Sequence, residues 1–225
     1  MLILHDVERE HPWREHKLIK VGLTGGIASG KSSVGEMFVR LGTHLIQADA
    51  VAHSLMQPGQ PVYGEVVRRF GTAILNSDQT INRPRLAEAA FGGSEGAAPR
   101  VQELNSIVHP AVMEFENKWM EEVGGRDPKA IAIVEAALIL EAGGADRFDH
   151  LMVVTCGPEQ RIQRYAQRMG ISEDAARTEV TRRMAAQVPD EEKIKAADFV
   201  IDNSGSLDAT RDQVQRIFDA LLREE

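Results

Sequence analysis

The chain has 225 residues, of which 43% are hydrophobic and 27% are charged, and its formal net charge is -8. That length is sufficient for one α/β domain with insertions around its own core. The acidic balance disfavours a nucleic-acid partner, because duplex binding usually requires a basic surface. No apolar run approaches the roughly 20 residues of a membrane helix. With no signal-peptide pattern and a single cysteine, Cys156, we expect a cytoplasmic protein.

The first elements are predicted from apolar runs and their spacing. Residues 1–17 are of mixed polarity, and we expect a polar N-terminal extension there without an assigned role. The apolar run 18–24 predicts a strand. The spacing of apolar residues after position 33 predicts a helix that Gly42 ends. A second short strand is predicted over 44–48, ending at Asp49.

The rest of the chain alternates between helical and apolar strand patterns. Residues 50–126 are mostly helical with turns, although 72–75 is ambiguous between strand and helix. Continuous apolar runs predict three further strands, over 130–134, 150–155 and 198–202. Between the last two lie arginine-rich helical segments, and an amphipathic helix closes the chain with Val214, Ile217, Phe218, Leu221 and Leu222 on one face.

This alternation predicts an α/β fold with a doubly wound parallel sheet. We expect a nucleotide-binding core formed by residues 18–55 and 128–225, which includes a lid at about 158–190. Residues 56–127 are expected to form a helical insertion that binds the acceptor.

Residues 25–32 read Gly-Gly-Ile-Ala-Ser-Gly-Lys-Ser, which matches the phosphate-loop pattern Gly-x-x-x-x-Gly-Lys-Ser/Thr between a strand and a helix. Backbone N–H groups of such a loop point at the phosphates of a nucleoside triphosphate. Lys31 is expected to neutralise the β- and γ-phosphates, and the Ser32 hydroxyl to bind Mg²⁺. The expected nucleotide-binding set is Gly25, Gly26, Ile27, Ala28, Ser29, Gly30, Lys31, Ser32 and Ser33. Thr24 either caps the loop or faces the acceptor.

Two carboxylates follow predicted strands. Asp49 lies at the end of the second strand, on the ligand side of an open α/β sheet, where it could accept a proton or hold Mg²⁺. The alternative is a helix N-cap. Glu135 follows the third strand and either supports a metal or simply ends the strand.

Further candidates are basic or lie in the expected insertion. Arg161, Arg164 and Arg168 have helical spacing, which is typical of a solvated face or of a lid that places guanidinium groups over a transferring phosphate. Arg164 is the first choice for that lid arginine. His109 is a packed histidine or a ligand contact, Arg83 meets acceptor phosphates or solvent, and Glu141 is structural or faces the acceptor.

These residues, in this order, resemble the dephospho-coenzyme A kinase family from about Lys20 to the C-terminal helix. The resemblance rests on the phosphate loop, Ile46-Gln47-Ala48-Asp49, Gln57-Pro58-Gly59, His109-Pro110, Ala136-Ala137-Leu138-Ile139-Leu140-Glu141 and the stretch from Gln187-Val188-Pro189 to Asp202-Asn203. One departure is Gln47, which stands where the family element has its first Asp. A role carried by that Asp does not transfer to this chain.

The resemblance implies phosphorylation of the ribose 3′-hydroxyl of dephospho-coenzyme A, with ATP as donor and Mg²⁺ as cofactor, in the last step of coenzyme A synthesis. It implies Asp49 as the catalytic carboxylate, together with Lys31 and the lid arginine Arg164, and it places Asn203 near the adenine. The expected acceptor-binding residues are Thr24, Asp49, Arg83, His109 and Glu141. We expect a monomer or a weak homo-oligomer.

Three alternatives stay open. The nearest is a nucleoside monophosphate kinase on the same fold. A non-catalytic nucleotide-binding relative is compatible with Gln47. A guanine-nucleotide switch is disfavoured, because Asn117-Lys118-Trp119-Met120 lacks the Asp of the guanine-reading Asn-Lys-x-Asp motif and lies within the helical stretch.

Overall fold

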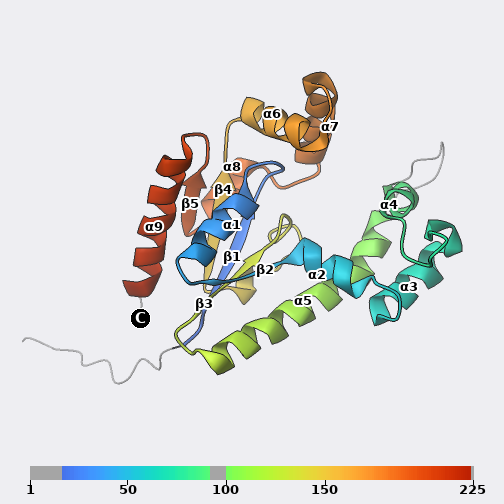
Figure 1. The fold of residues 1–225 in the computed structure, drawn as a ribbon, viewed down its shortest axis with the longest axis horizontal. Coiled ribbons are helices and arrows are strands. Elements are labelled where there is room, and N and C mark those ends of the chain that lie inside the picture. The colour runs from blue at the N-terminus through green and yellow to red at the C-terminus, as the bar shows by residue number, and fades with distance from the viewer. Residues whose placement is uncertain (1–16, 92–99, 224–225) are drawn as a thin grey trace, which may run out of the picture.

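The computed structural model describes residues 17–91 and 100–223, so the expected N-terminal extension lies outside the described residues except for Lys17. One parallel sheet forms the centre of the fold (Figure 1), in the strand order β2-β3-β1-β4-β5. Its strands are β1 (Ile19–Gly25), β2 (His44–Gln47), β3 (Ile131–Glu135), β4 (His150–Thr155) and β5 (Phe199–Asp202). The predicted α/β fold with a parallel sheet is therefore confirmed.

Alternation along the strands explains why the sheet is covered on both faces. In β3, Ile131 and Ile133 belong to one hydrophobic cluster, whereas Ala132 and Val134 belong to another. Successive side chains of a strand point to opposite faces, so a continuous apolar run needs a partner layer on each side. The layers are helical, as βαβ connections require.

The first face is covered by α1 (Lys31–Arg40) and by the C-terminal helix α9 (Leu207–Arg223), which contact each other. The apolar stripe predicted for the last helix is largely buried there, and Val214 is 1% exposed. On the opposite face lie α5 (Val101–Arg126), which packs on β3, and α8 (Asp190–Ala196), which packs on β4. Among the described residues, none of the helices has the length and apolar character needed to cross a membrane.

A second core lies beside the sheet, formed by the helices that precede β3 (Figure 1). It joins α5 to α2 (Ala48–Leu55), α3 (Pro61–Phe70) and α4 (Arg83–Phe91). The ambiguous stretch around residue 72 is a 3₁₀ turn, Thr72–Ile74, and only the next residue makes an isolated β-bridge.

Two helices lie above the carboxyl ends of the strands (Figure 1): α6 (Pro158–Met169) and α7 (Glu173–Ala185). They correspond to the arginine-rich segments and pack on each other. Two expectations were wrong in detail. The second strand ends at Gln47, so Asp49 lies in the first turn of α2 rather than at a strand end. Residues 190–196 form α8, where only a connection was expected.

Candidate active site

The phosphate loop connects the central strand β1 to α1. Gly25 and Gly30 both have positive φ, at 152° and 95°, which L side chains rarely adopt. Both glycines also lie against neighbouring protein groups. A Cβ atom at Gly25 would lie 2.2 Å from the Val154 carbonyl oxygen, and one at Gly30 would lie 2.1 Å from Asn203 Nδ2. The loop therefore needs glycine at both positions for its own packing.

The Lys31 ammonium group lies within this loop. Its Nζ donates to the carbonyl oxygens of Gly25 at 2.9 Å and of Gly26 at 3.1 Å. Burial, with a smaller contribution from the nearby Lys193 and Arg161, lowers the pKa of Lys31 to about 8, although Glu135 and Asp49 act in the opposite direction. A lysine with this pKa gains its full charge when phosphates come near.

Nucleotide binding is therefore expected to take up a proton at alkaline pH. Bound phosphates raise the pKa of Lys31, which is about 8, so at about pH 9 the lysine is mostly neutral before binding and charged after it. Titration calorimetry of ATP at about pH 9, in buffers with different ionisation enthalpies, should give clearly more proton uptake than the same titration at about pH 7. Equal uptake at the two pH values would contradict the prediction.

The same shift has a defined effect on stability. The unfolded state holds the Lys31 proton more tightly than the folded state, because the folded pKa of about 8 is below the ordinary 10.5. The contribution of Lys31 to the free energy of unfolding therefore rises as pH increases through the window between these two values.

Ser32 and Gln47 converge on one carboxylate. Ser32 Oγ donates to Glu135 Oε1 at 2.7 Å, and Gln47 Nε2 donates to Glu135 Oε2 at 3.0 Å. Gln47 and Glu135 are paired residues of neighbouring strands, which explains the contact. Hydroxyl and carboxylate oxygens are the hard ligands that Mg²⁺ prefers, with substrate phosphates completing its shell. The residues present fit such an ion, although the described part of the chain holds no group of three or more His, Cys, Asp or Glu of metal-binding type.

A cavity opens above the loop and brings together most of the predicted nucleotide-site residues. Its polar lining comprises Lys31, Ser32, Ser33, Asp49, Glu135, Arg164, Gln167, Arg168 and Asn203. These residues come from β1–α1, α2, the end of β3, α6 and the end of β5, which are distant in sequence. After β1 the chain continues to β2, toward one edge of the sheet, and after β3 it continues to β4, toward the other edge. The point between two such strands is the topological switch point, where open α/β sheets bind ligands.

Arg164 and Asn203 line this cavity, and both form hydrogen bonds to the phosphate loop. Arg164 donates from Nη2 to the Asn203 carbonyl oxygen at 2.8 Å and from Nη1 to the Ser29 carbonyl oxygen at 3.3 Å. The Asn203 side-chain amide also donates to Ser29, at 2.9 Å, and accepts from Thr210. Ser29 itself is buried. Arg164 and Asn203 thus share one carbonyl group of the loop.

A second cavity, which is mainly apolar, adjoins the first. Asp49 and Ala137 line both cavities. His109 lines the second one, and partial burial lowers its pKa. Thr24 is buried and its hydroxyl donates to the Ala137 carbonyl oxygen at 3.3 Å, at the boundary of the two.

The other two predicted acceptor residues lie elsewhere. Arg83, the first residue of α4, lines a third cavity next to the second one. Glu141 lines none of these three cavities. Its Oε1 accepts from the Val188 backbone N–H at 2.9 Å and pairs with Lys193 Nζ at 3.0 Å.

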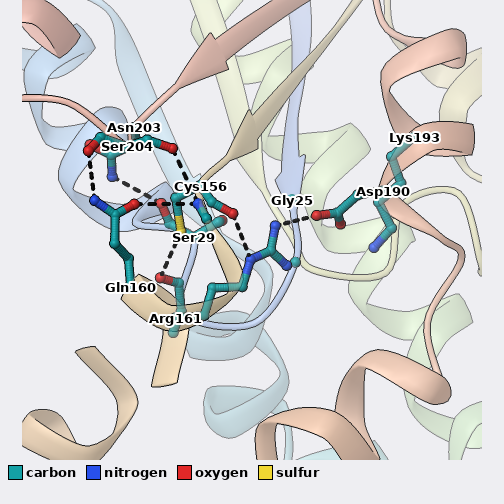
Figure 2. Close-up of polar contacts among 12 residues, drawn as sticks. Gly25, Ser29, Cys156, Gln160, Arg161, Asp190, Lys193, Asn203 and Ser204 are labelled. Carbon is teal, nitrogen blue, oxygen red and sulfur yellow. Dashed lines mark hydrogen bonds and ion pairs between the residues drawn. The ribbon is translucent and has the colours of Figure 1, made fainter. Parts of the chain in front are cut away.

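Several charged residues in or beside the site were not singled out from the sequence. Glu116 and Arg147 form an ion pair at 2.9 Å in the wall of the second cavity. Figure 2 shows two others next to the loop, Asp190 and Lys193, beside the predicted Arg161. The spacing of the arginines marked Arg161 in advance, but it did not mark its partner Asp190, which lies 29 positions away, or the pair of Glu116 and Arg147, which are 31 positions apart.

Removal of Arg147 is expected to destabilise the protein strongly. Glu116 is 2% exposed and its pKa is raised by burial, so Arg147→Met leaves a buried carboxylate without its partner. We expect a loss of about 3–5 kcal/mol in the free energy of unfolding at neutral pH. Because a raised pKa favours the protonated folded state, the variant should regain stability as pH falls toward the pKa of Glu116. Urea unfolding at several pH values measures both effects.

The matched control for this variant is Arg126→Met. Arg126 is on α5 like Glu116, its side chain is 81% exposed, and it pairs with Glu122 only at 3.8 Å. We expect that substitution to cost less than about 1 kcal/mol. Similar losses in the two variants would show that the buried pair contributes no more than a surface pair.

The geometry defines a class of protein. A phosphate loop at the switch point of a parallel sheet, a carboxylate shared with a neighbouring cavity and an arginine from an overlying helix are the parts of a P-loop kinase that phosphorylates a small molecule. Comparison with known proteins gives the same class and narrows it.

The family model described as dephospho-CoA kinase matches residues 19–209, and the chain belongs to the dephospho-CoA kinase family. It is therefore an ATP-dependent kinase of the final step of coenzyme A biosynthesis. A dephospho-CoA kinase of Corynebacterium efficiens is 40% identical over 91% of this chain and 98% of its own. One of Aquifex aeolicus is 37% identical over the same shares of the two chains.

Solved structures agree with the fold. A crystal structure of a protein from Thermus thermophilus has a TM-score of 0.72 and 29% identity, and the match covers 92% of this chain and 98% of that one. The structure of a dephospho-CoA kinase from Campylobacter jejuni gives a TM-score of 0.56 at 23% identity, over 90% and 96% of the two chains. The predicted fold, family and kinase activity are thus confirmed.

Proposed function

We propose that this protein transfers the γ-phosphoryl group of ATP to the ribose 3′-hydroxyl of dephospho-coenzyme A. The observation that carries the proposal is the position of Asp49, which lines both the cavity above the phosphate loop and the apolar cavity beside it. A carboxylate at such a boundary can orient an acceptor hydroxyl in one cavity toward a phosphate in the other.

The donor is proposed to lie along the loop. Backbone N–H groups of residues 25–33 face its phosphates, Lys31 neutralises their charge, and Arg164 stabilises the charge that develops on the transferring group. Asn203 stands next to the loop on the side proposed for the adenine. The lid, at about residues 158–190, excludes water when it closes.

Ser32 and Glu135 are the residues proposed to hold Mg²⁺, with Gln47 fixing the second oxygen of the carboxylate. When bound, the ion neutralises charge on the β- and γ-phosphates. Gln47 therefore supports one carboxylate rather than supplying another.

The acceptor is proposed to occupy the second cavity and to be held mainly by the helices over residues 56–127. His109 lies in that cavity and Thr24 lies at its boundary. Arg83 lines the adjoining cavity, where it could meet the acceptor diphosphate. Glu141 acts from outside these cavities, through its contacts with Val188 and Lys193. We further propose a cytoplasmic monomer or weak homo-oligomer without a nucleic-acid partner.

The experiment is a substrate panel. ADP release is measured with dephospho-coenzyme A, with adenosine and cytidine monophosphates and with no acceptor, and the product is identified by mass and by the position of the new phosphate. Of these acceptors, only dephospho-coenzyme A is expected to support turnover, and the new phosphate is expected at the ribose 3′ position. A preference for a nucleoside monophosphate would instead favour the alternative kinase, and the absence of any acceptor-dependent turnover would favour a non-catalytic relative.

A further inference from the structure

Arg161 is a buried arginine whose guanidinium group is fixed from two sides (Figure 2). The residue lies on α6 and is only 1% exposed. Its Nε donates to the Cys156 carbonyl oxygen at 3.1 Å, and its Nη2 donates to Asp190 Oδ2. A planar guanidinium with two such partners cannot swing away without breaking one of them. Its Nη1 is buried and has no hydrogen-bond acceptor among the described residues.

That Nη1 atom lies against the phosphate loop at Gly26. A Cβ atom at position 26 would lie 2.0 Å from Arg161 Nη1 and 3.2 Å from Asp190 Oδ1. Unlike Gly25 and Gly30, Gly26 does not have a positive φ, so any residue could adopt its backbone conformation. Space therefore requires glycine at this position, and Arg161 occupies that space.

The partners of Arg161 mark the two ends of the lid. Arg161 lies near the start of the lid, and Asp190 is the first residue of α8, where the lid segment returns to the core. Lys193, one turn further along α8, is 0% exposed and pairs with Glu141 at 3.0 Å. Glu141 in turn accepts from the Val188 N–H group, just before α8. The Arg161–Asp190 pair thus joins the two ends of the lid to each other, and the Lys193–Glu141 pair holds the second end to the core.

An apolar contact joins the same two parts of the molecule. Ile27, the loop residue after Gly26, packs in one cluster with Ile162 and Tyr165 of α6 and with Val180 of α7. Ile27 is 8% exposed and Ile162 is 4% exposed. A movement of α6 therefore displaces loop residues 26 and 27 together, because packed interiors transmit small shifts.

We propose that Arg161 is a positioning residue that couples the lid to the phosphate loop through Gly26. The guanidinium fills the place of a side chain at position 26, so the orientation of α6 sets the orientation of the loop N–H groups. In the reverse direction, phosphates bound on the loop favour one position of the lid. The inference rests on the proposed nucleotide site, but it does not depend on which acceptor is used.

The test is a double-mutant cycle between Gly26→Ala and Arg161→Met, read as kcat and KM for ATP. Methionine ends near the position of Nε, so it leaves room for the added methyl group. We expect Gly26→Ala alone to lower kcat/KM about 10²-fold, since a displacement of about 1 Å in a catalytic loop has that effect. In the Arg161→Met background, Gly26→Ala should lower kcat/KM by no more than about threefold, because the added methyl group and the guanidinium compete for the same space. Losses that multiply would overturn the proposal and show that phosphates themselves require Gly26.

Gly125→Ala is the matched control, because a Cβ atom there meets nothing within 4 Å. Asp190→Asn is a milder second variant that weakens one of the two contacts of the guanidinium. If Arg161→Met does not fold, Asp190→Asn should still partly reduce the loss of kcat/KM caused by Gly26→Ala.

Hydrogen exchange gives a separate readout. ATP should protect the amides of residues 173–185 in the wild type and in Gly125→Ala, but not in Arg161→Met at saturating ATP. Unchanged protection in Arg161→Met would also overturn the proposal. Failure of the proposed function instead leaves this protection intact and abolishes acceptor phosphorylation.

Discussion

Replacement of Asp49 by asparagine is expected to lower turnover about 10²- to 10⁴-fold, which is the usual contribution of a general base. Asparagine keeps the shape of the side chain but cannot accept the proton of the acceptor hydroxyl. Asp49 lies exposed in the first turn of α2 and lines both cavities, so the substitution removes no buried contact. ATP affinity and the melting temperature should stay nearly unchanged.

The measurements are steady-state ADP release with dephospho-coenzyme A and calorimetric titration with ATP. Asp208→Asn, on the exposed first turn of α9, is the matched control and should be fully active. Turnover of Asp49→Asn within a few-fold of the wild type would refute the assignment of the base. A loss confined to ATP affinity would instead move Asp49 from the acceptor to the nucleotide.

Replacement of Arg164 by methionine is expected to lower turnover about 10³-fold or more, as for other arginines that stabilise a transferring phosphoryl group. The effect on stability should be smaller. Arg164 is part-buried and donates to the carbonyl oxygens of Ser29 and Asn203, so we expect its loss to cost about 1–3 kcal/mol of folding free energy.

The two effects are separated by measuring kcat, the affinity for ADP and the melting temperature of the same variant. Arg211→Met, at an exposed position of α9, is the matched control. Arg164→Lys retains a charge without the planar fork and should recover only part of the activity. A fall in ADP affinity and in melting temperature that accounts for the whole loss of turnover would assign Arg164 a structural role.

The sequence predicted those features that depend on neighbouring residues. The three central strands β1, β3 and β4 are apolar runs buried on both faces, and the residues of the phosphate loop are contiguous, so both features can be recognised from the order of residues alone. The short helix α8 was missed because its sequence Asp-Glu-Glu-Lys-Ile-Lys-Ala is mostly charged, whereas its buried member is Lys193. A lysine is expected at the surface unless a distant partner such as Glu141 is known.

The arginines of α6 show the same limit within one helix. Arg161 and Arg168 are seven residues apart, so they lie on nearly the same helix face. Arg161 is nevertheless buried and Arg168 is exposed, because seven residues extend about 10 Å along the axis and only the first turns of α6 lie against the loop. Periodicity indicates which side of a helix a residue faces. It does not indicate how far along the helix axis a neighbouring element extends.

The carbonyl contacts of Lys31 have a consequence for which anions the loop accepts. Because the ammonium group donates two of its three hydrogens to the carbonyl oxygens of Gly25 and Gly26, a phosphate that takes more than one of them must compete with these protein acceptors. Binding is then a ligand exchange whose gain is reduced by the bonds given up. A single inorganic phosphate recovers little beyond that loss, while a triphosphate also gains the loop N–H groups along its length. We therefore expect the loop to bind a triphosphate in preference to a single inorganic phosphate.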